Sequence, residues 1–87
     1  MKVRHILVQH KYEAEDLHKQ ILGGKKFEDI AKKFSTCSSA SQGGDLGDVP
    51  VAKLDSDFAE ALEALKVQEI SKPVRTRFGY HLIQRLS

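Results

Sequence analysis

The chain has 87 residues, of which 40% are hydrophobic and 30% charged, and its formal net charge is +2. This length predicts one domain with a modest hydrophobic core, and so small a net charge gives no indication of nucleic-acid binding. The single cysteine excludes an intrachain disulfide and a CxxC metal or redox site. Without an apolar run near ~20 residues or a signal-peptide pattern, we predict a soluble, cytoplasmic protein; the alternative is one domain of a longer secreted protein.

The first half of the chain is predicted to hold a strand, two helices and a loop. Residues 3–10 are short and rich in Val, Ile and Leu, which is typical of a strand. Residues 12–22 and 26–34 show the helical spacing of apolar residues, and Gly23-Gly24 marks the end of the first helix. The Ser- and Gly-rich segment 35–44 is predicted to be a loop. The helix residues predicted to face the core are Ala14, Leu17, Ile21, Phe27, Ile30, Ala31 and Phe34.

The second half is predicted to hold one helix and three short strands. Residues 45–49 indicate an edge strand that ends at Pro50, and a helix begins near Asp55 to Asp57, any of which can cap it. Residues 70–74 and 79–86 indicate two strands too close for a helical crossover, so they are predicted to form a hairpin. The sequence therefore predicts an α+β domain: a small antiparallel sheet with helices packed around it.

Two of the four histidines, His5 and His81, lie in the middle of predicted strands. A buried imidazole needs hydrogen-bond partners, so the two rings can meet if the first and last strands are neighbours. The alternative is two unrelated histidines, each with its own partners. A zinc site with Cys37 lacks a close ligand pair and a fourth ligand. A Cys–His hydrolase has suitable residue types, but the chain is very small for a protease cleft.

Several segments together resemble one family, the parvulin peptidyl-prolyl cis–trans isomerases. The resemblance covers nearly the whole chain, and its segments follow one another in the family's order. It implies a four-stranded antiparallel sheet surrounded by helices in the order β-α-α-α-β-β, with a short additional strand near 45–49. The matching segments are HILV at 5–8, FEDIAKKFS at 27–35, CSSASQGGDLG at 37–47, PV at 73–74 and TRFGYHLI at 76–83.

The resemblance also implies a site. His5 and His81 match paired imidazoles beneath the active site, Cys37 stands at a position where the family has Cys or Asp, and Thr76 matches a hydroxyl in the histidine network. These four are the expected catalytic group. The expected substrate-binding residues are Leu46, Leu54, Phe58 and Phe78, although spacing alone allows Phe58 and Phe78 to be core residues. No metal or cofactor is implied.

The implied function is isomerisation of Xaa–Pro bonds, without covalent chemistry, in peptides and in unfolded or partly folded proteins. The expected partners are proline-containing segments, with no nucleic acid and no membrane, and the chain is expected to be a monomer. The predicted first strand passes into the helix without a long basic loop, so no phosphate specificity is expected. The family often has Gly and Met where this chain has Ala52 and Leu54. These departures support an alternative, a peptide-binding or chaperone module with little turnover.

Overall fold

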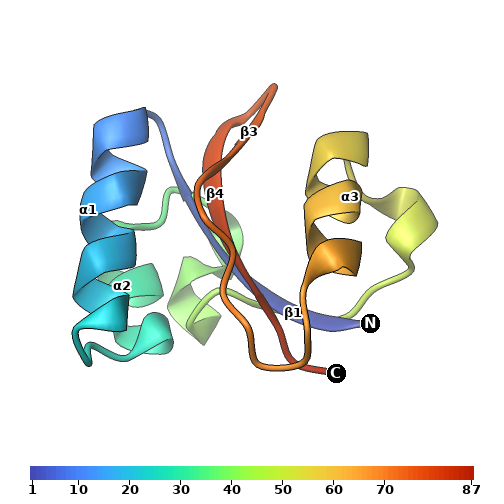
Figure 1. The fold of residues 1–87 in the computed structure, drawn as a ribbon, viewed down its shortest axis with the longest axis horizontal. Helices are drawn as coiled ribbons and strands as arrows, with labels where there is room; N and C mark the ends of the chain where they lie inside the picture. The colour runs from blue at the N-terminus through green and yellow to red at the C-terminus, as the bar shows by residue number, and fades with distance from the viewer.

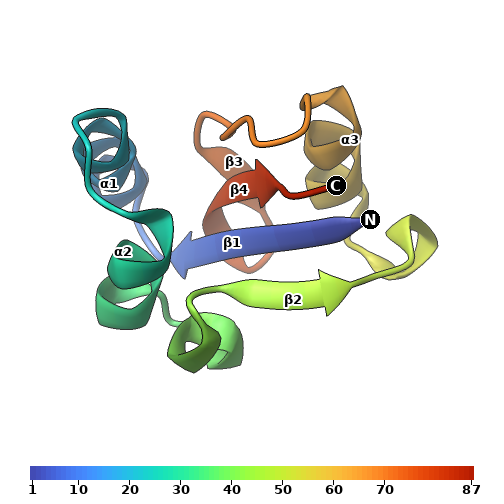
Figure 2. The same ribbon diagram turned by 90° about the horizontal axis from the view of Figure 1, so that it is seen from below.

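The computed structural model describes every residue from Met1 to Ser87 and contains one four-stranded antiparallel sheet with helices on both faces (Figures 1 and 2). The strands, in the spatial order β2-β1-β4-β3, are β1 (Lys2–Val8), β2 (Asp45–Asp48), β3 (Val74–Thr76) and β4 (Gly79–Arg85). The helices are α1 (Lys11–Leu22), α2 (Phe27–Phe34), α3 (Ser56–Ala64) and two short 3₁₀ helices, η1 (Ser38–Gln42) and η2 (Val51–Lys53). The α+β class and the parvulin-like sheet predicted from the sequence are confirmed. None of the helices combines the length and the apolar character needed to cross a membrane.

The central strands β1 and β4 come from opposite ends of the chain and pair in an antiparallel register from Val3 opposite Arg85 to Val8 opposite Tyr80. Because side chains alternate along a strand, each strand sends one set of side chains toward α1 and α2 and the other toward α3. His5 lies opposite Ile83, and Leu7 lies opposite His81. The two histidines are therefore diagonal neighbours on the face that α3 covers.

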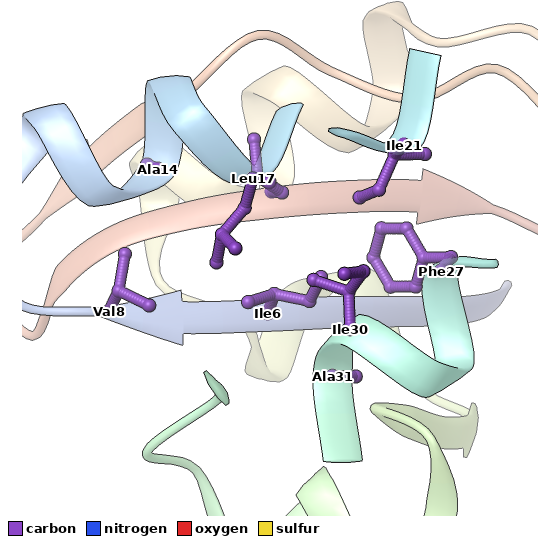
Figure 3. Packing of buried hydrophobic residues seen from close by; sticks show 9 residues of the cluster. Ile6, Val8, Ala14, Leu17, Ile21, Phe27, Ile30 and Ala31 are labelled. Carbon is purple, nitrogen blue, oxygen red and sulfur yellow. The ribbon is translucent and has the colours of Figure 1, made fainter. Parts of the chain in front are cut away.

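The larger core lies between the sheet and the α1–α2 layer (Figure 3). In Figure 3, Leu17 of α1 points toward Ile6 of β1, and Phe27 and Ile30 of α2 close the side of the cluster. Phe34 was predicted to join them, but this is wrong: it is 41% exposed. It is the last residue of α2, where the chain turns to extended backbone at Ser35. The nine buried members are Ile6, Val8, Ala14, Leu17, Ile21, Phe27, Ile30, Ala31 and Leu82.

The smaller core lies on the other face of the sheet, beneath α3. It has four buried members: Val3 of β1, Ile83 of β4, and Phe58 and Leu62 of α3. The helix begins where the sequence predicted, because the Asp55 carboxylate accepts a hydrogen bond from the Asp57 N–H at 3.0 Å. This N-cap fixes the first turn of α3 and, with it, the position of Phe58.

Two local expectations differ from the structure. The strand predicted at 70–74 is wrong: β3 begins only at Val74, and Ile70 makes an isolated bridge to Gln84. Pro73 interrupts the pairing because it has no N–H to donate to a ladder. The segment 35–44, predicted as a loop, contains η1, and η2 was not predicted at all.

Candidate active site

The structure joins His5 and His81 through a short contact between their rings. The two Nδ1 atoms are 3.1 Å apart, and the rings stack with centroids 5.2 Å apart at an interplanar angle of 20°. The Thr76 Oγ1 lies 2.8 Å from His81 Nε2, and the Phe78 N–H donates to the same oxygen at 3.2 Å. A continuous chain of hydrogen-bonding groups thus runs from the Phe78 N–H through Thr76 and His81 to His5, and its two side-chain contacts are buried.

Both imidazoles are neutral at pH 7. Burial and, to a smaller extent, the nearby His81 together lower the pKa of His5 to about 4. Burial also lowers the pKa of His81, although the Asp55 carboxylate partly opposes this shift. A single hydrogen between the two Nδ1 atoms is what a neutral pair requires, since each neutral ring has one donor and one acceptor nitrogen.

This chain of groups has two self-consistent proton arrangements. In one, the Thr76 hydroxyl donates to His81 Nε2, and His81 Nδ1–H donates to His5 Nδ1. In the other, His5 Nδ1–H donates to His81 Nδ1, and His81 Nε2–H donates to Thr76 Oγ1. In either arrangement His5 Nε2 is left over, and it is buried without a hydrogen-bond partner. An unpaired buried polar atom costs stability. The network of hydrogen bonds ends at this nitrogen, on a residue that lines the pocket.

A pocket of about 310 Å³ lies over the two histidines. It collects residues from distant parts of the chain: Leu46 from β2, Leu54 from the end of η2, Phe58 from α3 and Phe78 from the β3–β4 turn. Of the residues expected at the site, only Thr76 does not line it, because it lies behind His81. The full lining is His5, Leu7, Cys37, Leu46, Lys53, Leu54, Asp55, Phe58, Phe78 and His81.

Sequence reasoning missed three lining residues: Leu7, Lys53 and Asp55. Alternation along β1 could have found Leu7, because it lies two residues after His5 on the same face of the strand. Asp55 was predicted only as a possible helix cap. No local pattern marks Lys53, which reaches the pocket because η2 turns the chain just before Leu54.

Phe58 forms the wall where the pocket meets the histidine pair. Its ring packs edge-on against both imidazoles, with centroids 5.6 Å from His5 and 5.2 Å from His81. Phe58 is only 4% exposed. Phe58 is therefore both a member of the smaller core and a lining residue of the pocket. The sequence allowed either position, and the structure has both.

Cys37 lies at the rim of the pocket, half-buried, at the position that precedes η1. Burial raises the pKa of its thiol, but polar groups of Ser39 and Ser38 outweigh burial and leave the pKa below its usual value. The side chain makes no direct capping hydrogen bond to η1. The thiol thus faces the pocket with raised thiolate character.

Gly44 holds the loop that carries Cys37 against β1. Its φ of +82° is in the left-handed region, and a Cβ here would collide with the His5 carbonyl group. The Gly44 carbonyl accepts a hydrogen bond from the His5 N–H at 2.9 Å. The glycine in this segment is therefore required by close backbone approach at the histidine itself.

Asp55 connects the pocket rim to the β3–β4 turn. One carboxylate oxygen caps α3 and the other lies 3.7 Å from the Arg77 guanidinium. Arg77 also lies over the Phe78 ring, 4.9 Å from its centroid.

No set of three or more His, Cys, Asp or Glu residues is arranged to hold a metal ion, so the zinc alternative has no ligand set.

Comparison with known proteins gives a consistent result. The family model described as "Rotamase: PPIC-type PPIASE domain" matches residues 5–87. The chain is 46% identical over 86 residues to the foldase protein PrsA of Bacillus subtilis, covering 98% of this chain and 30% of that protein. It is 50% identical over 86 residues to a probable parvulin-type peptidyl-prolyl cis–trans isomerase of Bordetella pertussis, covering 95% of this chain and 33% of that protein.

The fold of this chain also matches the solved structure of a parvulin. The solution structure of NmPin, the parvulin of Nitrosopumilus maritimus, superimposes with a TM-score of 0.89 at 36% identity, covering 100% of this chain and 95% of that one. The chain thus spans about a third of the length of the two curated relatives, but almost the full length of this structural neighbour.

Proposed function

Because this chain belongs to the PPIC-type, parvulin family of peptidyl-prolyl cis–trans isomerases, we propose that the pocket over His5 and His81 binds the proline ring and accelerates rotation about Xaa–Pro bonds. The observation that supports this most is the apolar pocket that rests directly on two neutral, hydrogen-bonded imidazoles. Its substrates are proline-containing peptides and unfolded or partly folded protein segments.

The reaction needs an apolar pocket and no bond cleavage. Rotation about a peptide bond has a barrier of ~18–20 kcal/mol that arises from resonance, and X–Pro bonds take tens of seconds or longer to isomerise. An enzyme lowers this barrier by binding the twisted amide better than either planar isomer. Leu46, Leu54 and Phe58 hold the ring, and a surrounding of low polarity disfavours the charge-separated planar form.

The polar groups support this pocket in different ways. His5 and His81 form its floor and pack against the Phe58 wall, and Thr76 holds His81 from behind. The partly negative Cys37 sulfur lies at the rim, and negative charge beside the prolyl amide disfavours the resonance form with a negative carbonyl oxygen. Covalent attack by the thiol would add a step without lowering the rotational barrier, so no covalent intermediate is required.

The charges at the pocket support the absence of phosphate specificity. Lys53 is the one cation in the lining. The nearby Arg77 is paired with Asp55 rather than free, and a phosphate group is bound best by several cations in a fork-like arrangement. Substrates with phosphoserine before proline are therefore not preferred over those with Leu or Ala.

The experiment that tests the function is a protease-coupled isomerisation assay on tetrapeptides that vary only in the residue before proline. We expect acceleration for apolar residues and no gain for phosphoserine. Leu54→Ala should lower kcat/KM about tenfold, because it opens one wall of the pocket at a half-buried position. Leu22→Ala, at an exposed residue on the opposite face, is the matched control.

The alternative, a peptide-binding module with little turnover, is distinguished by exchange broadening of the cis and trans proton signals of the peptide. Binding without exchange would replace the enzyme with the module. Ala52, one of the two family departures that support the module, lies outside the pocket lining. The monomeric state, the lack of nucleic-acid and membrane partners, and the cytoplasmic location stay predictions.

A further inference from the structure

A second hollow, of about 440 Å³, lies between η2 and α3. In Figure 1, η2 stands beside α3 on the side that faces away from the sheet. The apolar part of its lining comes from both elements: Val51, Ala52, Leu54 and Ala59. The hollow is thus a groove between η2 and α3, and one of its lining residues, Leu54, also packs against the smaller core.

Two carboxylates edge this groove. Glu60 and Glu63 are exposed and three residues apart on α3, so they lie on the same face of the helix. The three ion pairs of the structure involve other residues: Met1 with Asp48, Arg4 with Glu28, and Arg77 with Asp55. Both glutamates are therefore free to bind a cation from another molecule.

The groove borders the proline pocket. Leu54 lines both of them, whereas Lys53 lines the proline pocket alone. A single leucine thus separates an apolar site for the proline ring from a groove with two negative charges. An extended chain advances about 3.3–3.6 Å per residue, so a polypeptide with its proline in the pocket brings a residue a few positions away over the groove.

We propose that this groove is a second substrate site that binds a Lys or Arg side chain of the same client polypeptide, a few residues from the proline. The aliphatic stem of the basic side chain lies on Ala52, Leu54 and Ala59, and its charged end reaches Glu60 and Glu63. Lys and Arg commonly bury their stems on apolar surface while the charged end stays in water. This inference rests on the proposed function, because it places the proline in the neighbouring pocket.

The test uses nine-residue peptides with one central Leu–Pro and a single Lys moved through positions from four before to four after the proline, with an all-Ala parent peptide. We expect one or two Lys positions to raise kcat/KM and lower Kd by about two- to fivefold, as for exposed ion pairs. Glu60→Gln/Glu63→Gln should abolish the Lys preference. The control variant Glu15→Gln/Asp16→Asn removes the same charge from exposed positions on α1, on the other side of the sheet. This variant should retain the Lys preference.

A charge reversal makes the test sharper. Glu60→Lys/Glu63→Lys should shift the preference from the Lys peptide to the corresponding Asp peptide, and salt should reduce both preferences because exposed charges are screened. A Lys preference that is equal in wild type and Glu60→Gln/Glu63→Gln, or absent at every position, would overturn the second site.

Failure of the proposed function gives a different result. In that case wild-type protein does not accelerate isomerisation of a short Leu–Pro tetrapeptide, which is too short to require the groove. The Kd values of the nine-residue peptides, measured by fluorescence anisotropy, then still report whether a Lys preference depends on Glu60 and Glu63.

Discussion

The two faces of the sheet are built differently. Under α1 and α2, nine buried apolar side chains form the larger core. Under α3, only four apolar residues are buried, and the same face buries His5, Thr76 and His81. Burying polar groups contributes less to stability than burying apolar ones. The face under α1 and α2, the apolar face, therefore mainly stabilises the fold. The face under α3, the polar face, has a smaller core and holds the pocket.

The largest effect should come from the apolar face. Leu17→Ala removes a 4%-exposed side chain from α1 and leaves a cavity, which typically lowers the free energy of unfolding by about 4 kcal/mol. Activity of the folded protein should not change, because the pocket lies across the sheet. Urea unfolding and the isomerisation assay at low temperature measure the two effects separately.

Leu22→Ala is the matched control for this prediction. Leu22 ends the same helix but is 70% exposed, so its loss should change the unfolding free energy by about 0.5 kcal/mol or less. An equal drop in kcat/KM and in stability for Leu17→Ala would show that the two faces are coupled, and the division between them would fail.

The next effect belongs to the polar face and depends on pH. The pKa of His5 falls from 6.5 in the unfolded chain to about 4 in the folded protein. Between these values the unfolded state binds more protons, so the unfolding free energy falls as pH decreases from 6.5 to 4. With about 1.4 kcal/mol for each pKa unit, the loss is on the order of 3 kcal/mol. His81, whose pKa is also lowered, adds to it.

Urea unfolding from pH 7.5 to 4 measures this slope, and the double variant His5→Leu/His81→Leu should lose it. Comparing the two proteins removes the contribution that carboxylates make at the acid end. NMR titration of the His5 ring protons should have its midpoint near pH 4. A midpoint near 6.5 would mean that the pair is not held neutral by burial.

A smaller effect should follow from Thr76, which acts through His81. Thr76→Val keeps the shape of the side chain but leaves His81 Nε2 and the Phe78 N–H without their partner. Loss of these bonds should lower the unfolding free energy by about 2 kcal/mol and also lower kcat, with less change in KM. Thr76→Ser restores the hydroxyl and should recover most of both losses, which a purely steric role would not predict.

The sequence was sufficient where a pattern is local and repeated. The strand predicted at 79–86 is β4, and the spacing of Phe27, Ile30 and Ala31 defined the buried side of α2. The meeting of His5 with His81 needed one further condition, that the first and last strands are neighbours, and the structure meets it. The parvulin resemblance supplied the pocket residues that no periodic pattern marks.

The errors lie where long-range geometry decides. Phe34 has core spacing, yet α2 ends at this residue and leaves it exposed. Residues 70–74 have strand composition, but within this range only Val74 belongs to a ladder with β4, and Ile70 makes an isolated bridge. Lys53 and Asp55 reach the pocket through the turn at η2, and no local pattern fixes how a short 3₁₀ turn points its neighbours.

The smallest effect should come from Cys37, at the edge of the polar face. It is half-buried and touches neither apolar core, so Cys37→Asp and Cys37→Ala should each change the unfolding free energy by about 1 kcal/mol or less. Since its proposed role is electrostatic, Cys37→Asp should keep kcat/KM within about tenfold of wild type, and Cys37→Ala should retain less.

The thiol pKa is lowered by the polar groups of Ser39 and Ser38, so wild-type kcat/KM should rise with pH as the thiol ionises, and Cys37→Asp should lack this rise. If both variants keep their circular dichroism spectrum and lose all activity, the electrostatic role of the sulfur is wrong, and covalent catalysis by Cys37 becomes the hypothesis to test.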